Sequence, residues 1–350
     1  MKGLVLAGGK GSRLRPFTYS GAKQLVPIAN TPVLHFPVRH LVEEGITDIA
    51  IVVGDTEPQI RDAMGDGSAF GARFTYLRQG APLGIAHGIL TARDFLGADP
   101  FVLYLGDNVL MGGIHDLLDA FASSGAAAGI VAKSVADPRA FGVAEFRDGR
   151  LIRVIEKPET PPTDLAVIGV YAFTAAVFEV IERQRPSARG ELEIADTING
   201  LLAAGHLVQS SVTSAYWIDT GKMEDILDAN RVVLASLPET EPSADGCFTF
   251  EGTVRIGDGA TLDNCRLLGP VVIGEGATLR DCVIGPDVSI GDGCTFERVS
   301  IRNAIVMDHT ELGDCPGIAD SMIGRYARVH GAPAGARLTL GDHSCIEANA

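Results

Sequence analysis

The chain has 350 residues, enough for two domains of about 150 residues each, and a net charge of −15. Its content of 46% hydrophobic and 21% charged residues predicts a globular protein with a large core and excludes a disordered one. Because an acidic surface repels phosphate backbones and anionic lipids, the charge argues against nucleic acids and membrane surfaces as partners.

The N-terminal two thirds alternate between predicted strands and helices. The apolar run at residues 2–7 is too short for a signal peptide, and no run reaches the length of a spanning helix, so we expect a cytoplasmic protein. Strands are predicted at 2–7, 48–53, 74–77 and 101–105, helices at 32–44, 84–95 and 223–237, and a hairpin at 141–156 that turns at Asp148-Gly149. This alternation predicts an α/β domain with a mostly parallel sheet, whose ligands bind beyond the carboxyl ends of the strands.

The C-terminal third repeats with a period of 17 residues. Residues 256–265 (IGDGATLDNC) return as 273–282 (IGEGATLRDC), and a third copy begins at Ile290. Aliphatic residues spaced six apart beside glycine-containing corners are typical of a parallel β-helix with 17 or 18 residues in each coil. The polar, proline-containing segment 236–246 is the predicted linker. We therefore expect one domain at residues 1–238 and a second at 239–350.

All six cysteines lie at or after residue 247, and they contain no C-x-x-C pair. This pattern favours small buried side chains within the coils over a zinc or redox site. Cys265 and Cys282 are expected one above the other, with Cys247 beneath them. The full set is Cys247, Cys265, Cys282, Cys294, Cys315 and Cys345.

A glycine-rich loop follows the first predicted strand. Residues 6–16 read LAGGKGSRLRP, and Lys23 follows ten residues after Arg13. Three glycines let backbone N–H groups approach phosphate oxygens, and the two cations add charge. The loop is neither a Walker A motif, because Gly11 follows Lys10, nor a dinucleotide fingerprint, because Leu14 takes the third glycine position. A tight structural turn is the alternative.

Two carboxylates follow apolar stretches next to glycines. Asp107 stands in a Gly-Asp-Asn sequence and Asp219 in an Asp-Thr-Gly sequence. If both segments meet at the sheet edge, they could hold Mg²⁺, which takes one or two carboxylates together with substrate phosphates. Ordinary turns are the alternative for each.

Three further segments carry polar groups with a plain structural alternative. Glu156-Lys157 ends an apolar strand and could be a solvated pair. Gln79 and residues 82–86 could contact the edge of a base. Residues 190–194 (GELEI) could accept sugar hydroxyls, or form the acidic first turn of a helix.

Taken in this order, the motifs resemble those of the sugar nucleotidyltransferase family. They look like the motifs of glucose-1-phosphate thymidylyltransferases, and the repeats resemble the long form of these enzymes. The matching motifs are residues 6–16 with Lys23, 106–108 (GDN), 141–143 (FGV), 156–158 (EKP), 190–194 and 219–221 (DTG). The resemblance covers essentially the whole chain. It implies a Rossmann-like catalytic domain followed by a left-handed β-helix. It also implies Mg²⁺-dependent transfer of the nucleotidyl group of dTTP to glucose 1-phosphate. Stacked coils with open ends further suggest a homo-oligomer.

The resemblance also implies a role for each matching residue, and it shows one departure. His87 stands where many relatives carry Gln, which leaves its role open. The implied set is Arg13, Lys23 and Lys157 for catalysis; Leu6, Ala7, Gly8, Gly9, Gly11, Gln79, Pro82 and Gly84 for the nucleotide; Asn108, Gly142, Glu156, Val167 and Glu193 for the sugar; and Asp107 and Asp219 for Mg²⁺.

Three alternatives remain at the level of sequence. The enzyme could use UTP or another triphosphate, with a different sugar or cyclitol phosphate. The coils could transfer acyl groups with His309, His330 or His343 as a base, although surface or inter-coil histidines are the simpler interpretation. The chain could also be a silent binding or scaffolding protein, against which the retained cations and carboxylates argue.

Overall fold

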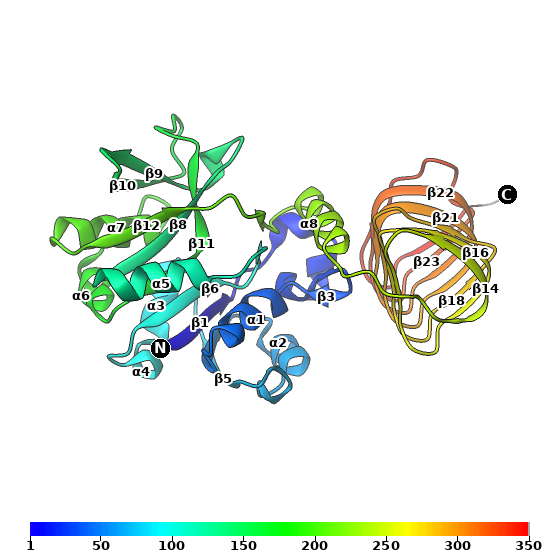
Figure 1. The fold of residues 1–350 in the computed structure, drawn as a ribbon, viewed down its shortest axis with the longest axis horizontal. Coiled ribbons are helices and arrows are strands. Elements are labelled where there is room, and N and C mark those ends of the chain that lie inside the picture. Colours follow the sequence, from blue (N-terminus) through cyan, green and yellow to red (C-terminus); the bar gives the residue numbers. More distant parts are fainter. Residues whose placement is uncertain (349–350) are drawn as a thin grey trace. The chain divides into compact units, whose positions relative to one another are not determined.

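The computed structural model describes residues 1–348 and divides the chain into two compact units (Figure 1). One unit contains residues 1–10 and 34–219, and the other contains residues 11–33 and the chain from 220 onward. These units differ from the predicted domains because the segment 11–33 and the helix after 220 group with the coils. The domain boundary between 238 and 239 remains a prediction.

A mixed sheet forms the first unit. Its order is β10-β9-β11-β6-β1-β4-β5, with β8 beside β11 and β12 beside β8. The strands β6, β1, β4 and β5 are parallel, whereas β11 runs antiparallel to β6, β8 and β9. The bounds are β1 (Lys2–Ala7), β4 (Asp48–Val53), β5 (Arg73–Arg78), β6 (Phe101–Leu105), β8 (Ala128–Ser134), β9 (Gly142–Arg147), β10 (Arg150–Glu156), β11 (Leu165–Phe173) and β12 (Val208–Val212).

Helices join these strands, and one of them differs from its prediction. The predicted helix at 84–95 is two helices, because the backbone leaves helical geometry at Ala92. The helices are α1 (His35–Glu43), α2 (Glu57–Met64), α3 (Ile85–Thr91), α4 (Arg93–Leu96), α5 (His115–Ser124), α6 (Ala176–Arg183) and α7 (Ile194–Ala203).

Among residues 1–348, no helix is both long and apolar enough to cross a bilayer.

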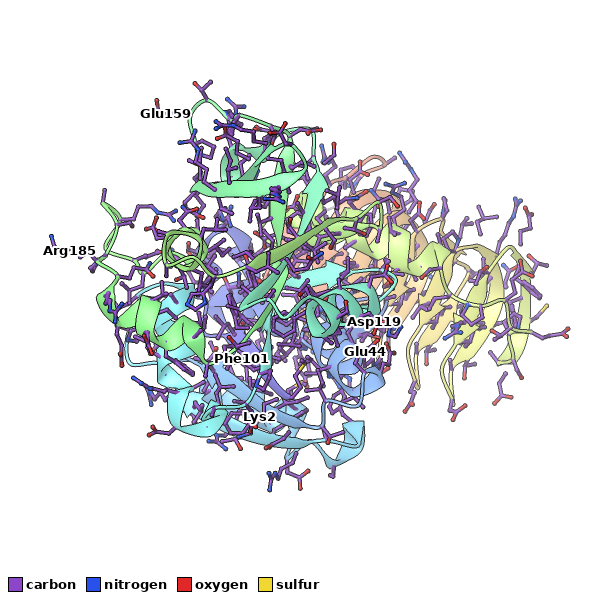
Figure 2. The ribbon with its side chains drawn as sticks, turned by 60° about the vertical axis from the view of Figure 1, so that its left-hand side comes forward. Lys2, Glu44, Phe101, Asp119, Glu159 and Arg185 are labelled. Atoms are coloured by element: carbon purple, nitrogen blue, oxygen red, sulfur yellow. The ribbon has the colours of Figure 1, made fainter. Side chains whose placement is uncertain are left out.

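Aromatic side chains fill the core of the first unit. The ring of Phe101 lies 5.7 Å from that of Phe173 and 6.2 Å from that of Phe178, measured between centroids. Figure 2 shows Phe101 inside this body, whereas Glu159 and Arg185 project from its periphery. The apolar run at 101–105 is buried because its strand lies in the middle of the sheet.

The coils of the second unit are stacked in parallel register (Figure 1, yellow to red). One inward column runs Leu262, Leu279, Phe296, Leu312, Val329 and Ile346, each paired with the next. The parallel β-helix is therefore confirmed, and its strands are consistent with the left-handed form. They are β14 (Asp245–Glu251), β15 (Val254–Ile256), β16 (Thr261–Leu268), β17 (Val271–Ile273), β18 (Thr278–Arg280), β19 (Val283–Ile284), β20 (Val288–Ile290), β21 (Thr295–Val306), β22 (Glu311–Ile323), β23 (Arg328–His330), β24 (Thr339–Leu340) and β25 (Cys345–Glu347).

Four of the six cysteines occupy the predicted buried positions. Cys265 and Cys282 lie in adjacent coils, and Cys294 and Cys315 are also buried. The prediction is wrong for Cys345 and Cys247, which are both exposed. Phe248, and not Cys247, pairs with Cys265, whereas Cys247 pairs with Asp263 and is exposed.

One face of the coils is covered by the helix α8 (Met223–Ala235), which contacts β20, β21 and β22. The outward middle positions of these strands, Ser289, Ile305 and Met322, are fully buried. The segment 11–33 belongs to the same unit and contains the short helices η1 (Ser12–Leu14), η2 (Phe17–Tyr19) and η3 (Lys23–Leu25) and the strands β2 (Pro27–Ile28) and β3 (Thr31–Pro32).

Candidate active site

The carboxyl ends of β1 and β6 bring two of the predicted motifs to one sheet edge. Leu6 pairs with Leu105, and the Gly106 N–H donates to the Leu6 carbonyl at 2.9 Å. A Cβ on Gly106 would lie 2.8 Å from that carbonyl oxygen, so only glycine allows this approach. Gly8 and Asp107 consequently follow neighbouring strands at the same edge.

The two predicted metal ligands come from paired strands. β7 (Asn108–Leu110) runs antiparallel to β13 (Trp217–Asp219), which places Asp219 opposite Asn108. The buried Asn108 amide donates to Asp107 Oδ1 at 3.0 Å and accepts from Trp217 Nε1 at 2.6 Å. Asn108 thus connects Asp107 to the strand that carries Asp219.

This pair of carboxylates fits Mg²⁺, which prefers hard oxygen ligands. Within residues 1–348, no group of three or more His, Cys, Asp or Glu side chains is arranged to hold a metal ion. The other ligands of an ion held by Asp107 and Asp219 would therefore be water and phosphate oxygens.

A pocket opens beside this strand pair. Phe141 and Trp217, whose rings meet edge to face at 5.2 Å, lie in its wall. Six residues of the predicted site also line it: Asn108, Gly142, Glu156, Lys157, Val167 and Asp219. The combination of apolar walls, carboxylates and an ammonium group suits a polar, anionic small molecule.

The hairpin of β9 and β10 shapes the polar side of this pocket. A Cβ on Gly142 would lie 3.3 Å from Glu156 Oε2, so the glycine leaves room for the carboxylate. Lys157 has a left-handed backbone with φ 43°, its N–H donates to the Phe141 carbonyl, and its Nζ lies 3.4 Å from Glu156 Oε1. The end of this hairpin therefore holds an ammonium group and a carboxylate side by side at the pocket.

Arg189 is a site residue that sequence reasoning missed. Its guanidinium lies 2.8 Å from Glu193 Oε1 and 3.1 Å from Glu156 Oε1. It therefore joins the two acids predicted to bind sugar hydroxyls, of which Glu193 is buried. The sequence could have indicated Arg189 by its position directly before the acidic motif at 190–194, since buried carboxylates need a cationic partner.

The surroundings of the pocket favour the protonated forms of Tyr171 and Asp196. Burial, and then the neighbouring Glu156 carboxylate, raise the pKa of Tyr171. Burial also raises the pKa of Asp196, with a further contribution from Glu193. Tyr171, which lines the pocket, is therefore a neutral phenol at physiological pH.

Gln79 connects three of the predicted nucleotide-binding positions. Its Nε2 lies 3.4 Å from the Gly84 carbonyl oxygen and 2.8 Å from His87 Nδ1. Its Oε1 lies 3.4 Å from where a Cβ on Gly8 would stand. Gly84 has φ 103°, and a Cβ there would lie 2.5 Å from the Leu192 carbonyl oxygen, so this position requires glycine. Pro82 is exposed in the preceding loop.

The second unit holds the remaining predicted cations. Gly11 has φ 59°, and a Cβ on it would lie 2.7 Å from Lys23 Cβ, so Lys23 packs against the glycine turn. Arg13 Nη2 lies 2.8 Å from the position that a Cβ on Gly221 would take. Each cation therefore contacts a glycine of a predicted motif, and Gly221 follows Asp219 by two residues in the chain.

The histidines considered for acyl transfer lie in contacts between coils. The rings of His309 and His343 stack on opposite sides of Tyr326, at 5.0 and 5.1 Å between centroids. His330 pairs with Gly313 in the adjacent coil. These contacts agree with the interpretation of the three histidines as surface or inter-coil residues.

The α/β fold and a pocket lined by two carboxylates and a lysine are typical of enzymes that bind small anionic substrates. Residues 2–236 match the model of the family described as nucleotidyl transferase. The chain therefore belongs to the nucleotidyl transferase family.

Curated relatives match the chain over nearly its whole length. A glucose-1-phosphate thymidylyltransferase of Streptomyces griseus is 44% identical over 352 residues, covering 98% of each chain. The low-salt glycan biosynthesis nucleotidyltransferase Agl11 of Haloferax volcanii is also 44% identical, covering 99% of this chain and all of its own. A crystal structure from Bacillus anthracis, described as a glucose-1-phosphate thymidylyltransferase in complex with sucrose, aligns with a TM-score of 0.64 and 36% identity, covering 69% of this chain and 98% of that one.

Proposed function

We propose that the protein converts dTTP and α-D-glucose 1-phosphate to dTDP-glucose and pyrophosphate. The observation that carries this proposal is the pocket in which Lys157 and Glu156 stand beside the Asp107 and Asp219 strand pair. Its lining, which combines apolar walls with carboxylates and an ammonium group, suits a sugar phosphate. The full-length likeness to thymidylyltransferases supports this choice of substrates.

In this reaction an oxygen of the sugar phosphate attacks the α-phosphorus of dTTP, and the bond to pyrophosphate breaks. The attacking phosphate is already anionic near neutral pH, so the protein need not remove a proton. Its task is to hold two mutually repelling anions in line and to offset the charge that develops between them. Lys157 would bind the sugar phosphate, and Arg13 and Lys23 would bind the triphosphate.

The other residues would orient the two substrates. The N–H groups after Leu6 and Ala7, at Gly8, Gly9 and Gly11, would approach phosphate oxygens. Gln79 would contact the base beside Gly84 and Pro82, and Glu156 and Glu193 would accept sugar hydroxyls. Mg²⁺ held by Asp107 and Asp219 would supply positive charge to the phosphates. Asn108, Gly142 and Val167 would shape the pocket.

The proposal is tested by a matrix of triphosphates against sugar 1-phosphates, read as pyrophosphate released. We expect dTTP with glucose 1-phosphate to give the highest kcat/KM. A higher value with UTP or with another sugar phosphate would replace the substrates named here. Release from none of the pairs would refute the activity.

The contact between His87 and Gln79 leads to a prediction about the nucleotide. In His87→Leu the Gln79 amide loses its shorter hydrogen bond, to His87 Nδ1, and keeps only the 3.4 Å contact with the Gly84 carbonyl. We expect the KM for dTTP to rise about threefold to tenfold, the usual worth of one hydrogen bond, with no change in the KM for glucose 1-phosphate. Steady-state kinetics measures both constants, and His206→Leu, at an exposed turn, is the control. An unchanged KM for dTTP would exclude this role.

We also propose that the coils serve assembly into a homo-oligomer. Stacked coils present flat faces and open ends, which proteins usually cover. Light scattering on the purified chain would give its mass in solution.

A further inference from the structure

The turn between β2 and β3 is fastened to the coils through one amide on α8. The Ala29 N–H donates to Asn230 Oδ1 at 2.8 Å, and Ser289 Oγ donates to the same oxygen at 2.7 Å. Asn30 Nδ2 donates directly to the Ile290 carbonyl at 2.6 Å. The turn, the helix and the strand β20 therefore share one hydrogen-bond network.

Two members of this network are fully buried, and the backbone of its turn is constrained. Asn230 and Ser289 are both 0% exposed, so water cannot replace a lost partner without cost. Ala29 and Asn30 both have left-handed backbones, with φ 48° and 58°. Two successive residues of this kind form a tight hairpin turn, which has little freedom to move.

A second attachment lies earlier in the same segment. Ser20 Oγ donates to Asp342 Oδ2 at 2.7 Å, in the last coils. Pro16 lies against Gly341, where a Cβ would stand 3.1 Å from Pro16 Cβ. The segment 11–33 is thus held by two distant parts of the coil sequence. In the sequence, Lys23 lies between Ser20 and Ala29, and Arg13 precedes Pro16 by three residues.

We propose that the coils position the triphosphate-binding segment, with Asn30, Asn230 and Ser289 as positioning residues. This inference rests on the proposed function, in which Arg13 and Lys23 bind the triphosphate. Lys157 and Glu156 belong to the other unit and are held by its hairpin. Loosening the attachment should therefore weaken the use of dTTP and leave that of glucose 1-phosphate intact.

Asn30→Gly is the sharpest test, because glycine keeps the left-handed backbone and removes only the side-chain donor. We expect the KM for dTTP to rise about threefold to tenfold, with an unchanged KM for glucose 1-phosphate. Ser289→Ala, which removes the second donor to Asn230, should act in the same direction.

Asn264→Gly is the matched control. Asn264 also has a left-handed backbone, with φ 52°, and its amide also donates to the next coil, at Asp281 Oδ1. It lies on an exposed part of the coils. We expect both KM values of this variant to equal those of the unaltered protein.

Two kinetic results would overturn the proposal. One is an Asn30→Gly variant that behaves like Asn264→Gly. The other is an equal rise in both KM values together with a lower Tm, which would mark a purely structural role.

Hydrogen exchange without substrates tests the attachment independently of activity. In Asn30→Gly we expect faster exchange of amides within 11–33, with those of 34–219 unchanged. Unchanged exchange in 11–33 would overturn the proposal. Loss of transfer in the substrate matrix, with this exchange pattern intact, would instead place the failure in the proposed function.

Discussion

Replacing Arg13 with alanine is expected to lower kcat about 100-fold or more, because a cation aimed at developing phosphate charge is worth that much in mutational series. The side chain is exposed and packs against Gly221, so its removal leaves the core untouched. The Tm should change little, since exposed substitutions rarely alter stability by more than about 0.5 kcal/mol. Pyrophosphate release at saturating dTTP and glucose 1-phosphate measures kcat, and thermal unfolding followed by circular dichroism measures Tm.

Arg15→Ala is the matched control for this variant. Arg15 is another exposed arginine of the same segment, and its guanidinium lies 5.0 Å from the centre of the Tyr19 ring. Its loss removes the same charge from the protein, so the difference between the two variants isolates position from net charge. Near-normal turnover in Arg13→Ala, or an equal loss in Arg15→Ala, would count against the catalytic role.

Elements governed by local pattern could be predicted from the sequence. The strands at 2–7, 48–53 and 101–105 match to the residue, because short continuous apolar runs bounded by polar or glycine residues are typical of buried parallel strands. The hairpin turning at Asp148-Gly149 and the coil period follow from equally local signals. Parallel strands then place Gly8 and Asp107 at one edge, as expected.

Features that depend on distant contacts could not be predicted in this way. The network that ties Ala29 to the coils joins Asn230 and Ser289 across 59 residues of sequence, and no local pattern encodes that partnership. The sequence does hint that something covers this face of the coils, because Ile305 and Met322 are apolar side chains at outward positions. Arg189 was missed for a similar reason, since its two carboxylate partners lie in separate motifs.

The second large effect is expected for the acids at the strand pair. Asp107→Asn keeps the shape of the side chain and the oxygen that accepts from Asn108, but removes one negative charge. Because Mg²⁺ binds carboxylates far better than neutral amides, we expect at least a tenfold higher Mg²⁺ concentration for half-maximal activity, and a kcat about 100-fold lower. Asp219→Asn, from the paired strand, should behave alike, and the two losses should not add fully if both side chains hold one ion.

Asp55→Asn supplies the control for these variants. Asp55 follows β4 at the same carboxyl edge of the sheet, but it is exposed and its nearest cation, Arg78, lies 3.9 Å away. A Mg²⁺ titration of this variant should match that of the unaltered protein, which would show that a carboxylate at this edge is not sufficient. An unchanged titration in both Asp107→Asn and Asp219→Asn would remove the metal from these residues. Additive losses in the double variant would mean that the two carboxylates act separately, and that the pairing of their strands has no part in binding the ion.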